Sequence, residues 1–86
     1  MENKIYFGID CDPFVRHQED FQKEAEAVLG REIKATSKFF GCWEYEEEMS
    51  SEQHKKICDI LVDYYQRGDC RGIACDDIKK LRPELF

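Results

Sequence analysis

Two aspartates, Asp10 and Asp12, stand one residue apart at the end of an alternating apolar segment, "KIYFGIDCDPF", at 4–14. Carboxylates are ligands that hard divalent cations prefer, and such a cation can activate water for attack on a phosphoester. One hypothesis is therefore a divalent-metal-dependent phosphoesterase or nuclease-like enzyme that uses both aspartates. The competing interpretation is structural: Asp12 caps a helix that begins at Pro13, and Asp10 complements the positive end of that helix. We favour the structural interpretation, because an isolated short motif is weak evidence for a site.

An apolar strand followed by Asp-x-Asp also resembles the first motif of the haloacid-dehalogenase-type phosphatases, in which one aspartate attacks phosphorus and the next handles a proton. The resemblance covers only Asp10 and Asp12. That family also uses a Thr or Ser, a Lys and a further acidic pair on later strands of a much longer chain. Here Pro13 follows with no Thr, so we do not assign the chain to that family.

The cysteines do not follow the spacing of a structural zinc site. They are five in number, and four residues separate the closest two, Cys70 and Cys75. Structural zinc sites favour closer pairs that occur twice. The N-terminal segment has no apolar signal region, and no apolar run is long enough to span a bilayer. We therefore expect reduced thiols, no cofactor, no membrane partner and a cytoplasmic location; the five cysteines are Cys11, Cys42, Cys58, Cys70 and Cys75.

Four acidic residues lie close to two aromatic residues in the segment "WEYEEE" at 43–48. The whole chain carries 19 acidic and 13 basic residues, a net charge of -6. This balance argues against direct binding of nucleic acid, which depends on clustered Lys and Arg, and it favours a basic protein partner. We expect the partner-binding residues to be four contact charges and two aromatic anchors: Glu44, Glu46, Glu47 and Glu48, with Trp43 and Tyr45.

Size and charge together favour a small, acidic, non-enzymatic protein-binding module. One concrete form is an inhibitor of the phage or mobile-element type, anti-CRISPR or anti-restriction, that blocks the basic nucleic-acid-binding surface of a nucleic-acid-processing complex. A third hypothesis, beside this one and the hydrolase, is a homodimeric regulatory domain that pairs through strand edges or sheet faces.

Hydrophobic periodicity predicts the first half of the chain as a strand, a helix and a second strand. Residues 4–9 alternate as a half-buried strand. The predicted helix runs from Pro13 to Gly30, and its apolar stripe consists of Phe14, Phe21, Ala25 and Val28. Residues 32–40 alternate again, with Ile33, Ala35, Ser37 and Phe39 against Lys34, Thr36, Lys38 and Phe40.

The second half repeats the pattern. A third strand is predicted at 42–47, followed by a helix that opens with a capping box at Ser50 and Gln53 and ends at Gly68. The segment at 71–75 predicts a short fourth strand. A last helical turn, capped by Asp76, should end at Arg82 and Pro83.

The predicted order of elements is β-α-β-β-α-β. Two right-handed crossovers convert this order most simply into an α+β, ferredoxin-like sandwich with two helices packed on one face of an antiparallel sheet. We expect a single α+β domain over 1–86, since the chain is too short for a second core.

Overall fold

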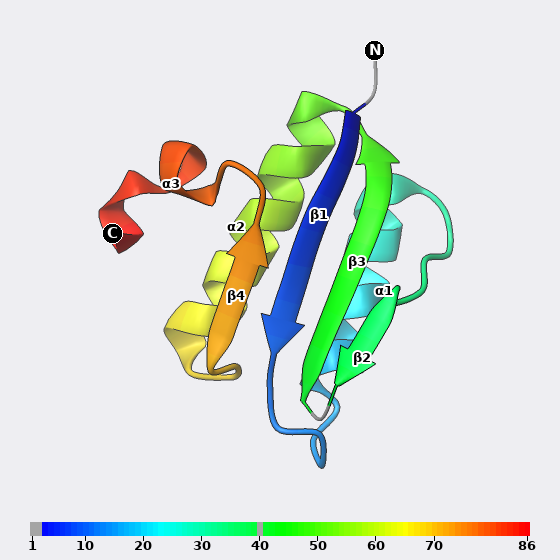
Figure 1. Cartoon of the computed structure of the whole chain (residues 1–86), viewed down its shortest axis with the longest axis vertical. Coiled ribbons are helices and arrows are strands. Elements are labelled where there is room, and N and C mark those ends of the chain that lie inside the picture. The colour runs from blue at the N-terminus through cyan, green and yellow to red at the C-terminus, as the bar shows by residue number, and fades with distance from the viewer. Residues whose placement is uncertain (1–2, 40) are drawn as a thin grey trace.

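The computed structural model describes residues 3–39 and 41–86 and places two long helices on one face of an antiparallel sheet (Figure 1). The predicted α+β class is confirmed. In chain order the elements are β1 (Asn3–Asp10), α1 (His17–Leu29), β2 (Ser37–Phe39), β3 (Cys42–Met49), α2 (Ser51–Arg67), β4 (Gly72–Cys75), α3 (Ile78–Leu81) and the short 3₁₀ helix η1 (Pro83–Leu85).

The strands lie in the order β2-β3-β1-β4, and each neighbouring pair is antiparallel. Along the central pair, Lys4 lies opposite Glu48 and Asp10 lies opposite Cys42. Alternate residues of a strand point to opposite faces, so even-numbered residues of β1 and β3 share the face that α1 and α2 leave uncovered. We call this uncovered side of the sheet the open face.

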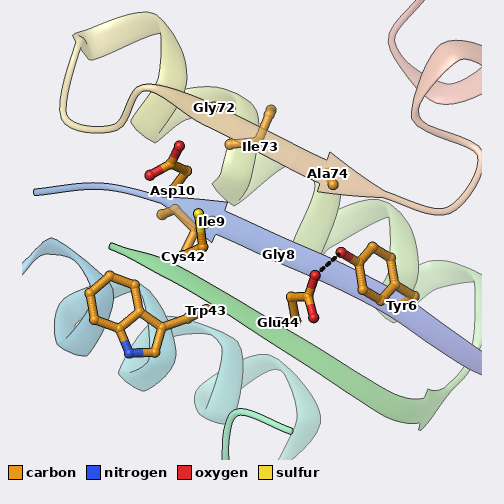
Figure 2. A pocket seen from close by; sticks show the side chains of 10 residues that line it. All are labelled: Tyr6, Gly8, Ile9, Asp10, Cys42, Trp43, Glu44, Gly72, Ile73 and Ala74. Carbon is orange, nitrogen blue, oxygen red and sulfur yellow. Dashed lines mark hydrogen bonds between the residues drawn. The ribbon is translucent and has the colours of Figure 1, made fainter. Parts of the chain in front are cut away.

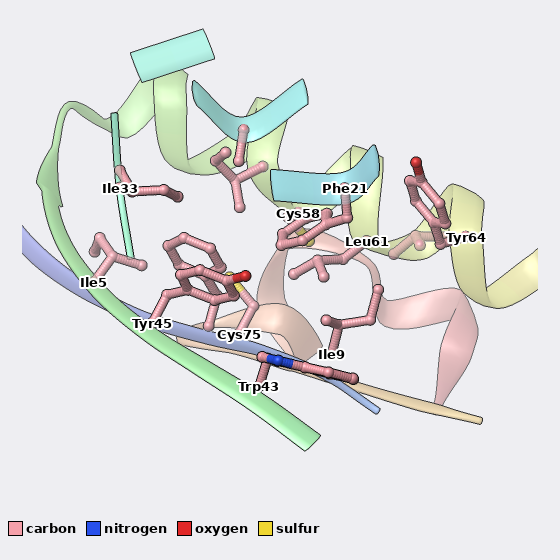
Figure 3. Close-up of a cluster of buried hydrophobic side chains, with 14 of the residues drawn as sticks. Ile5, Ile9, Phe21, Ile33, Trp43, Tyr45, Cys58, Leu61, Tyr64 and Cys75 are labelled. Atoms are coloured by element: carbon pink, nitrogen blue, oxygen red, sulfur yellow. The ribbon is translucent and has the colours of Figure 1, made fainter. Parts of the chain in front are cut away.

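The covered face carries the hydrophobic core, whose centre is a set of packed aromatic rings (Figure 3). Phe7 of β1 stacks on Tyr45 of β3 with ring centroids 5.1 Å apart, and both rings meet the ring of Phe21 from α1. Phe21 in turn meets Tyr64 of α2 edge to face. These rings therefore join both helices to the two central strands.

The buried hydroxyl of Tyr45 is satisfied by two glutamines of α1. It donates a hydrogen bond to Gln22 Oε1 at 2.8 Å and accepts one from Gln18 Nε2. Burial raises the pKa of Tyr45, so the hydroxyl keeps its proton. The polar end of this ring thus helps to fix α1 against the sheet.

Helix α1 begins four residues later than the sequence predicts. The carboxylate of Asp12 accepts a hydrogen bond from the backbone N–H of Phe14 at 2.9 Å, which closes a turn and leaves α1 to begin at His17 without a side-chain cap. The prediction of Asp12 as N-cap and Pro13 as first helical residue is therefore wrong. Phe14 is 86% exposed, so no burial favours extending the helix towards it. The predicted end is confirmed, with Gly30 in a left-handed conformation.

The strand predicted at 32–40 is reduced to β2. Side chains of α1 bind the backbone of Ile33: Gln22 Nε2 donates to its carbonyl at 2.9 Å, and Glu26 Oε2 accepts from its N–H at 3.1 Å. These contacts replace the ladder that a strand would need. The predicted alternation also fails, because Phe39 lies opposite Cys42 on the open face and is 77% exposed. The predicted partner position Phe40 lies outside the described residues.

The chain after β4 differs from its prediction at one residue. Asp76 does not cap α3, whose N-cap is Asp77 in a left-handed conformation. Instead, the N–H of Asp76 donates to the carbonyl of Tyr6 at 3.0 Å, and its carboxylate accepts from the N–H of Tyr6 at 3.1 Å. Asp76 thus extends the pairing of β4 with β1. Helix α3 ends at Leu81, before Arg82 and Pro83 as predicted.

The capping box predicted for α2 is present. The hydroxyl of Ser50 accepts from the backbone N–H of Gln53 at 3.2 Å, and the Gln53 side chain accepts from the backbone N–H of Ser50 at 3.0 Å. Two N–H groups at the start of the helix are thereby satisfied.

Among the described residues, no helix has the length and apolar character needed to cross a membrane.

Replacing Ser50 by Ala is expected to lower the free energy of unfolding by about 1 kcal/mol, because the first turn of α2 loses an acceptor for a backbone N–H. Chemical denaturation monitored by circular dichroism measures this loss. The matched control is Ser51→Ala at the next, exposed position inside the helix, where alanine is the better helix former. Equal stability of the two variants would contradict the capping role.

Candidate functional site

Three of the predicted contact charges share the open face of the sheet. Glu44, Glu46 and Glu48 lie on β3 opposite Gly8, Tyr6 and Lys4 of β1. 

One of these three glutamates, Glu46, makes a long ion pair with Lys4. Lys4 Nζ lies 3.8 Å from Glu46 Oε1, and both side chains are about half exposed or more. An exposed ion pair of this kind contributes roughly 0–1 kcal/mol and leaves the carboxylate available to solvent. The open face therefore keeps negative charge along β3.

Glu47 lies apart from this group. The alternation of β3 sends its side chain towards the covered face, where Arg31 Nη2 lies 3.1 Å from Glu47 Oε1. The same Arg31 nitrogen donates to the backbone carbonyl of Glu48. The four predicted contact charges therefore do not lie on one face, because Glu47 is on the covered side.

The two predicted anchors are also on the covered face. Trp43 is 7% exposed and Tyr45 is fully buried, and both belong to the hydrophobic core (Figure 3). Their surface is already removed from water by α1 and α2, so neither ring is available to a partner of the folded protein. The prediction of Trp43 and Tyr45 as contact residues is wrong, because the sequence shows that they alternate with acids but not which face the helices cover.

A hollow of about 230 Å³ lies in the open face beside these glutamates (Figure 2). Its floor consists of small residues on adjacent strands, Gly8 of β1 with Gly72 and Ala74 of β4. A Cβ atom on Gly8 would lie 3.1 Å from the carbonyl oxygen of Trp43. The hollow therefore exists because the strands lack larger side chains at these positions.

Tyr6 and Glu44 form one end of the hollow. The phenol of Tyr6 donates a hydrogen bond to Glu44 Oε1 at 3.0 Å, and Figure 2 shows this contact reaching across the position of Gly8. Burial and then the hydrogen bond to Glu44 raise the pKa of Tyr6. Tyr6 therefore remains a neutral donor that holds the Glu44 carboxylate at the rim of the hollow.

Asp10 and Cys42 form the other end. Arg71 Nη2 lies 3.1 Å from Asp10 Oδ1, and the N–H of Arg71 donates to the carbonyl of Asp10 at 2.7 Å. Burial, followed by the negative charge of Asp10, raises the pKa of the Cys42 thiol. Cys42 consequently stays protonated and is not activated as a nucleophile.

The two aspartates of the Asp-x-Asp motif have separate partners. Asp10 pairs with Arg71 on the open face, whereas Asp12 closes the turn at Phe14. Within 3–39 and 41–86, no three or more His, Cys, Asp and Glu side chains are grouped so that they could hold a metal ion. The hydrolase hypothesis thus lacks a ligand set in the part of the chain that the structure describes. The prediction that Asp10 complements the start of α1 is replaced by its pairing with Arg71.

The remaining cysteines are part of the core. Cys11, Cys58, Cys70 and Cys75 are buried, and all five thiols are free. Burial raises the pKa of Cys11, and it raises that of Cys70 to about 11. Buried cysteines of this kind serve as small apolar side chains.

Sequence reasoning missed the hollow and the role of Arg71. Gly8 interrupts a strand of larger residues, and a glycine inside a strand often marks a close approach or an open space. That signal was readable at Gly8, but its neighbours Gly72 and Ala74 are more than sixty positions away in the sequence. Only the register between β1 and β4 brings them together.

Functional inference rests on this geometry, because comparisons with known proteins found no match. No family model matches the sequence, and no match was found among curated proteins or among solved structures.

Proposed function

We propose that this chain is a small, non-enzymatic binding protein whose open face binds a basic surface of a partner protein. The observation that carries the proposal is the row formed by Glu44, Glu46 and Glu48 on the uncovered side of β3. The net charge of -6 acts in the same direction, because it attracts a basic partner and speeds the encounter at low salt.

The composition of the open face supports this proposal. Among side chains that the structure describes, the strands place four carboxylates on this face, where Lys4 contacts Glu46 and Arg71 pairs with Asp10. The carboxylates belong to Asp10, Glu44, Glu46 and Glu48. This imbalance disfavours nucleic acid and suits Lys and Arg side chains of a protein.

Exposed aromatic residues on the same face supply apolar contact area. Tyr6 is 37% exposed at the rim of the hollow, and Phe39 is exposed on β2 opposite Cys42. Aromatic side chains contribute strongly to binding energy at protein interfaces, particularly where surrounding contacts exclude water. Tyr6 and Phe39 therefore take the role that the sequence suggested for Trp43 and Tyr45.

We infer as a specific form of this function an inhibitor of the phage or mobile-element type, anti-CRISPR or anti-restriction. Such a protein would place its carboxylates where nucleic-acid phosphates otherwise bind on a nucleic-acid-processing complex. The small size of the chain and its acidic face support this form. A cytoplasmic location would give it access to such a complex.

We also infer that the fold is the ferredoxin-like sandwich. The element order from β1 to β4, the strand order β2-β3-β1-β4 and the placement of α1 and α2 on one face support this inference. Cross-strand amide contacts between Lys38 and Trp43, and between Ile9 and Ile73, measured by NMR, would test it, because both outer strands are short.

The double variant Glu46→Lys/Glu48→Lys is expected to weaken binding of an oligolysine peptide by roughly tenfold at low salt. Each exposed charge should contribute ~0.7 kcal/mol, and about 1.4 kcal/mol corresponds to tenfold. Fluorescence anisotropy with a labelled peptide measures the dissociation constant at low and high salt. The salt dependence should also become flatter, since fewer opposite charges face the peptide.

The matched control is Glu19→Lys/Glu52→Lys, which makes the same change of net charge on exposed positions of α1 and α2. It should retain most of the binding, because these residues lie on the other side of the sheet. Equal loss in both double variants would show that net charge alone attracts the peptide. Unchanged binding in the Glu46/Glu48 variant would remove the open face as the docking surface.

A further inference from the structure

We propose that the hollow in the open face is a recognition site for one arginine side chain of the basic partner. This inference rests on the proposed function and deepens it, because it gives the docking surface a specific pocket and a preferred residue type. Figure 2 shows the arrangement that carries it: small residues form the floor, and carboxylates stand at the two ends.

The floor of the hollow allows a flat group to approach the backbone. Gly8 and Gly72 contribute no side-chain atoms, and Ala74 contributes one methyl group. A Cβ on Gly72 would meet only the Cβ of Asp10, at 3.9 Å, within 4 Å. The space above these strands is therefore open enough for a planar guanidinium.

Glu44 supplies a carboxylate that is already held in place. Its Oε1 atom accepts the hydrogen bond from Tyr6, which fixes the side chain at the rim with little further loss of conformational freedom on binding. A guanidinium carries five N–H donors in a planar fork and can pair with a carboxylate through two parallel hydrogen bonds. The adjacent ring of Tyr6 also provides a surface on which such a group can stack.

The opposite end of the hollow already holds a guanidinium from the chain itself. Arg71 Nη2 lies 3.1 Å from Asp10 Oδ1, so an arginine fits against a carboxylate of this face. This internal pair satisfies Asp10 and leaves Glu44 as the carboxylate that a partner can engage. The partner's arginine is accordingly assigned to the end formed by Tyr6 and Glu44.

A lysine is the weaker occupant by the same reasoning. Its ammonium group is a strongly hydrated point charge that neither stacks on an aromatic ring as a plane nor forms a fork with a carboxylate. The hollow should therefore distinguish oligoarginine from oligolysine, whereas the exposed charges of Glu46 and Glu48 should not.

The experiment compares binding of oligoarginine and oligolysine peptides of equal length to the full chain and to variants of the hollow. Wild-type protein should bind oligoarginine more tightly by roughly tenfold. Ala74→Val narrows the floor opposite Gly8, beside Glu44, with a residue suited to a strand, and Glu44→Gln removes the charge while keeping an acceptor for Tyr6. Both variants should abolish the preference for arginine, and Ala74→Val should leave oligolysine binding unchanged.

Gly72→Ala is the matched control for position, since Gly72 lies opposite Asp10 at the other end of the hollow and its added methyl group meets only an ordinary contact at 3.9 Å. It should keep most of the preference. Thermal unfolding verifies that each variant folds. If Ala74→Val does not fold, Ala74→Thr narrows the same part of the floor and replaces it.

The outcomes separate this inference from the function on which it rests. If Ala74→Val keeps the arginine preference while Glu46→Lys/Glu48→Lys weakens both peptides, the arginine site is overturned and the acidic docking surface stands. If wild-type protein binds the two peptides equally, the arginine site is likewise overturned. If neither peptide binds to the wild-type chain at low salt, both proposals fail.

Discussion

Replacing Phe21 by Ala is expected to lower the free energy of unfolding by about 3–5 kcal/mol. Phe21 is fully buried, and its ring meets those of Phe7, Tyr45 and Tyr64. Truncation removes these contacts and leaves a cavity between α1, α2 and the sheet, which the surrounding rings can fill only in part. Urea denaturation measures the loss, which is a large share of the roughly 5–15 kcal/mol that stabilises a typical domain.

The control is the same substitution at Phe14. The sequence places both phenylalanines on one helical stripe, but Phe14 lies before α1 with 86% of its surface exposed. Phe14→Ala should therefore change the free energy of unfolding by about 0.5 kcal/mol or less. A loss at Phe14 as large as that at Phe21 would contradict the late start of α1.

Local patterns were sufficient to predict the elements whose stability depends on their own sequence. The alternation at 4–9 predicts β1 within one residue at each end, because one face of this strand is apolar and the other is not. The capping box at Ser50 and Gln53 and the glycine at Gly68 define α2, since caps act over a few residues. These signals require no knowledge of distant contacts.

The segment at 32–40 could not be predicted in this way. Its alternation is regular, yet Gln22 and Glu26 of α1 bind the backbone of Ile33 and prevent a ladder there. Side chains that compete with a strand for backbone groups come from another element. Tertiary hydrogen bonds therefore override the predicted alternation over most of this segment. As a result Phe39 lies on the open face, and not on the same side as Ile33 as the alternation predicts.

The candidate site was predictable only in part for the same reason. Alternation along the predicted strand at 42–47 places Glu44 and Glu46 together, and this part of the prediction needs only a strand period of two. Glu48 joins them because β3 extends to Met49. Which face of β3 the helices cover is a property of the whole fold. Trp43 and Tyr45 were consequently assigned to the wrong role, and Glu47 was grouped with contact charges from which the fold separates it.

The sheet separates residues that stabilise the fold from residues available for binding. Odd-numbered side chains of β1, such as Phe7 and Ile9, are buried beneath the helices, whereas the open face carries charged and small residues. Substitutions at Glu46 and Glu48 should therefore alter binding with little effect on stability. The hollow depends on residues of both kinds. Residues of the open face line it, and a turn of the backbone at Gly41 holds its end at Asp10.

Replacing Gly41 by Ala is expected to lower the free energy of unfolding by about 3 kcal/mol. Gly41 has a φ of 91°, and an added Cβ would lie 2.8 Å from the carbonyl oxygen of Cys11 and 2.9 Å from Arg71 Nη2. The first of these atoms is backbone and cannot move without weakening the 2.8 Å hydrogen bond from Cys11 N–H to the Gly41 carbonyl. The second is the guanidinium that pairs with Asp10, so the same methyl group displaces Arg71 from the end of the hollow.

Gly30→Ala separates the two causes of this loss. Gly30 also has a left-handed conformation, with a φ of 72°, but nothing lies within 4 Å of its added Cβ. Its substitution should lower the free energy of unfolding by about 1 kcal/mol, the cost of the backbone conformation alone. The additional loss at Gly41, measured by the same urea denaturation, reports the close approach of Cys11 and Arg71. Equal losses at both glycines would mean that the chain relaxes around Gly41 and that the end of the hollow at Asp10 is not held in a fixed position.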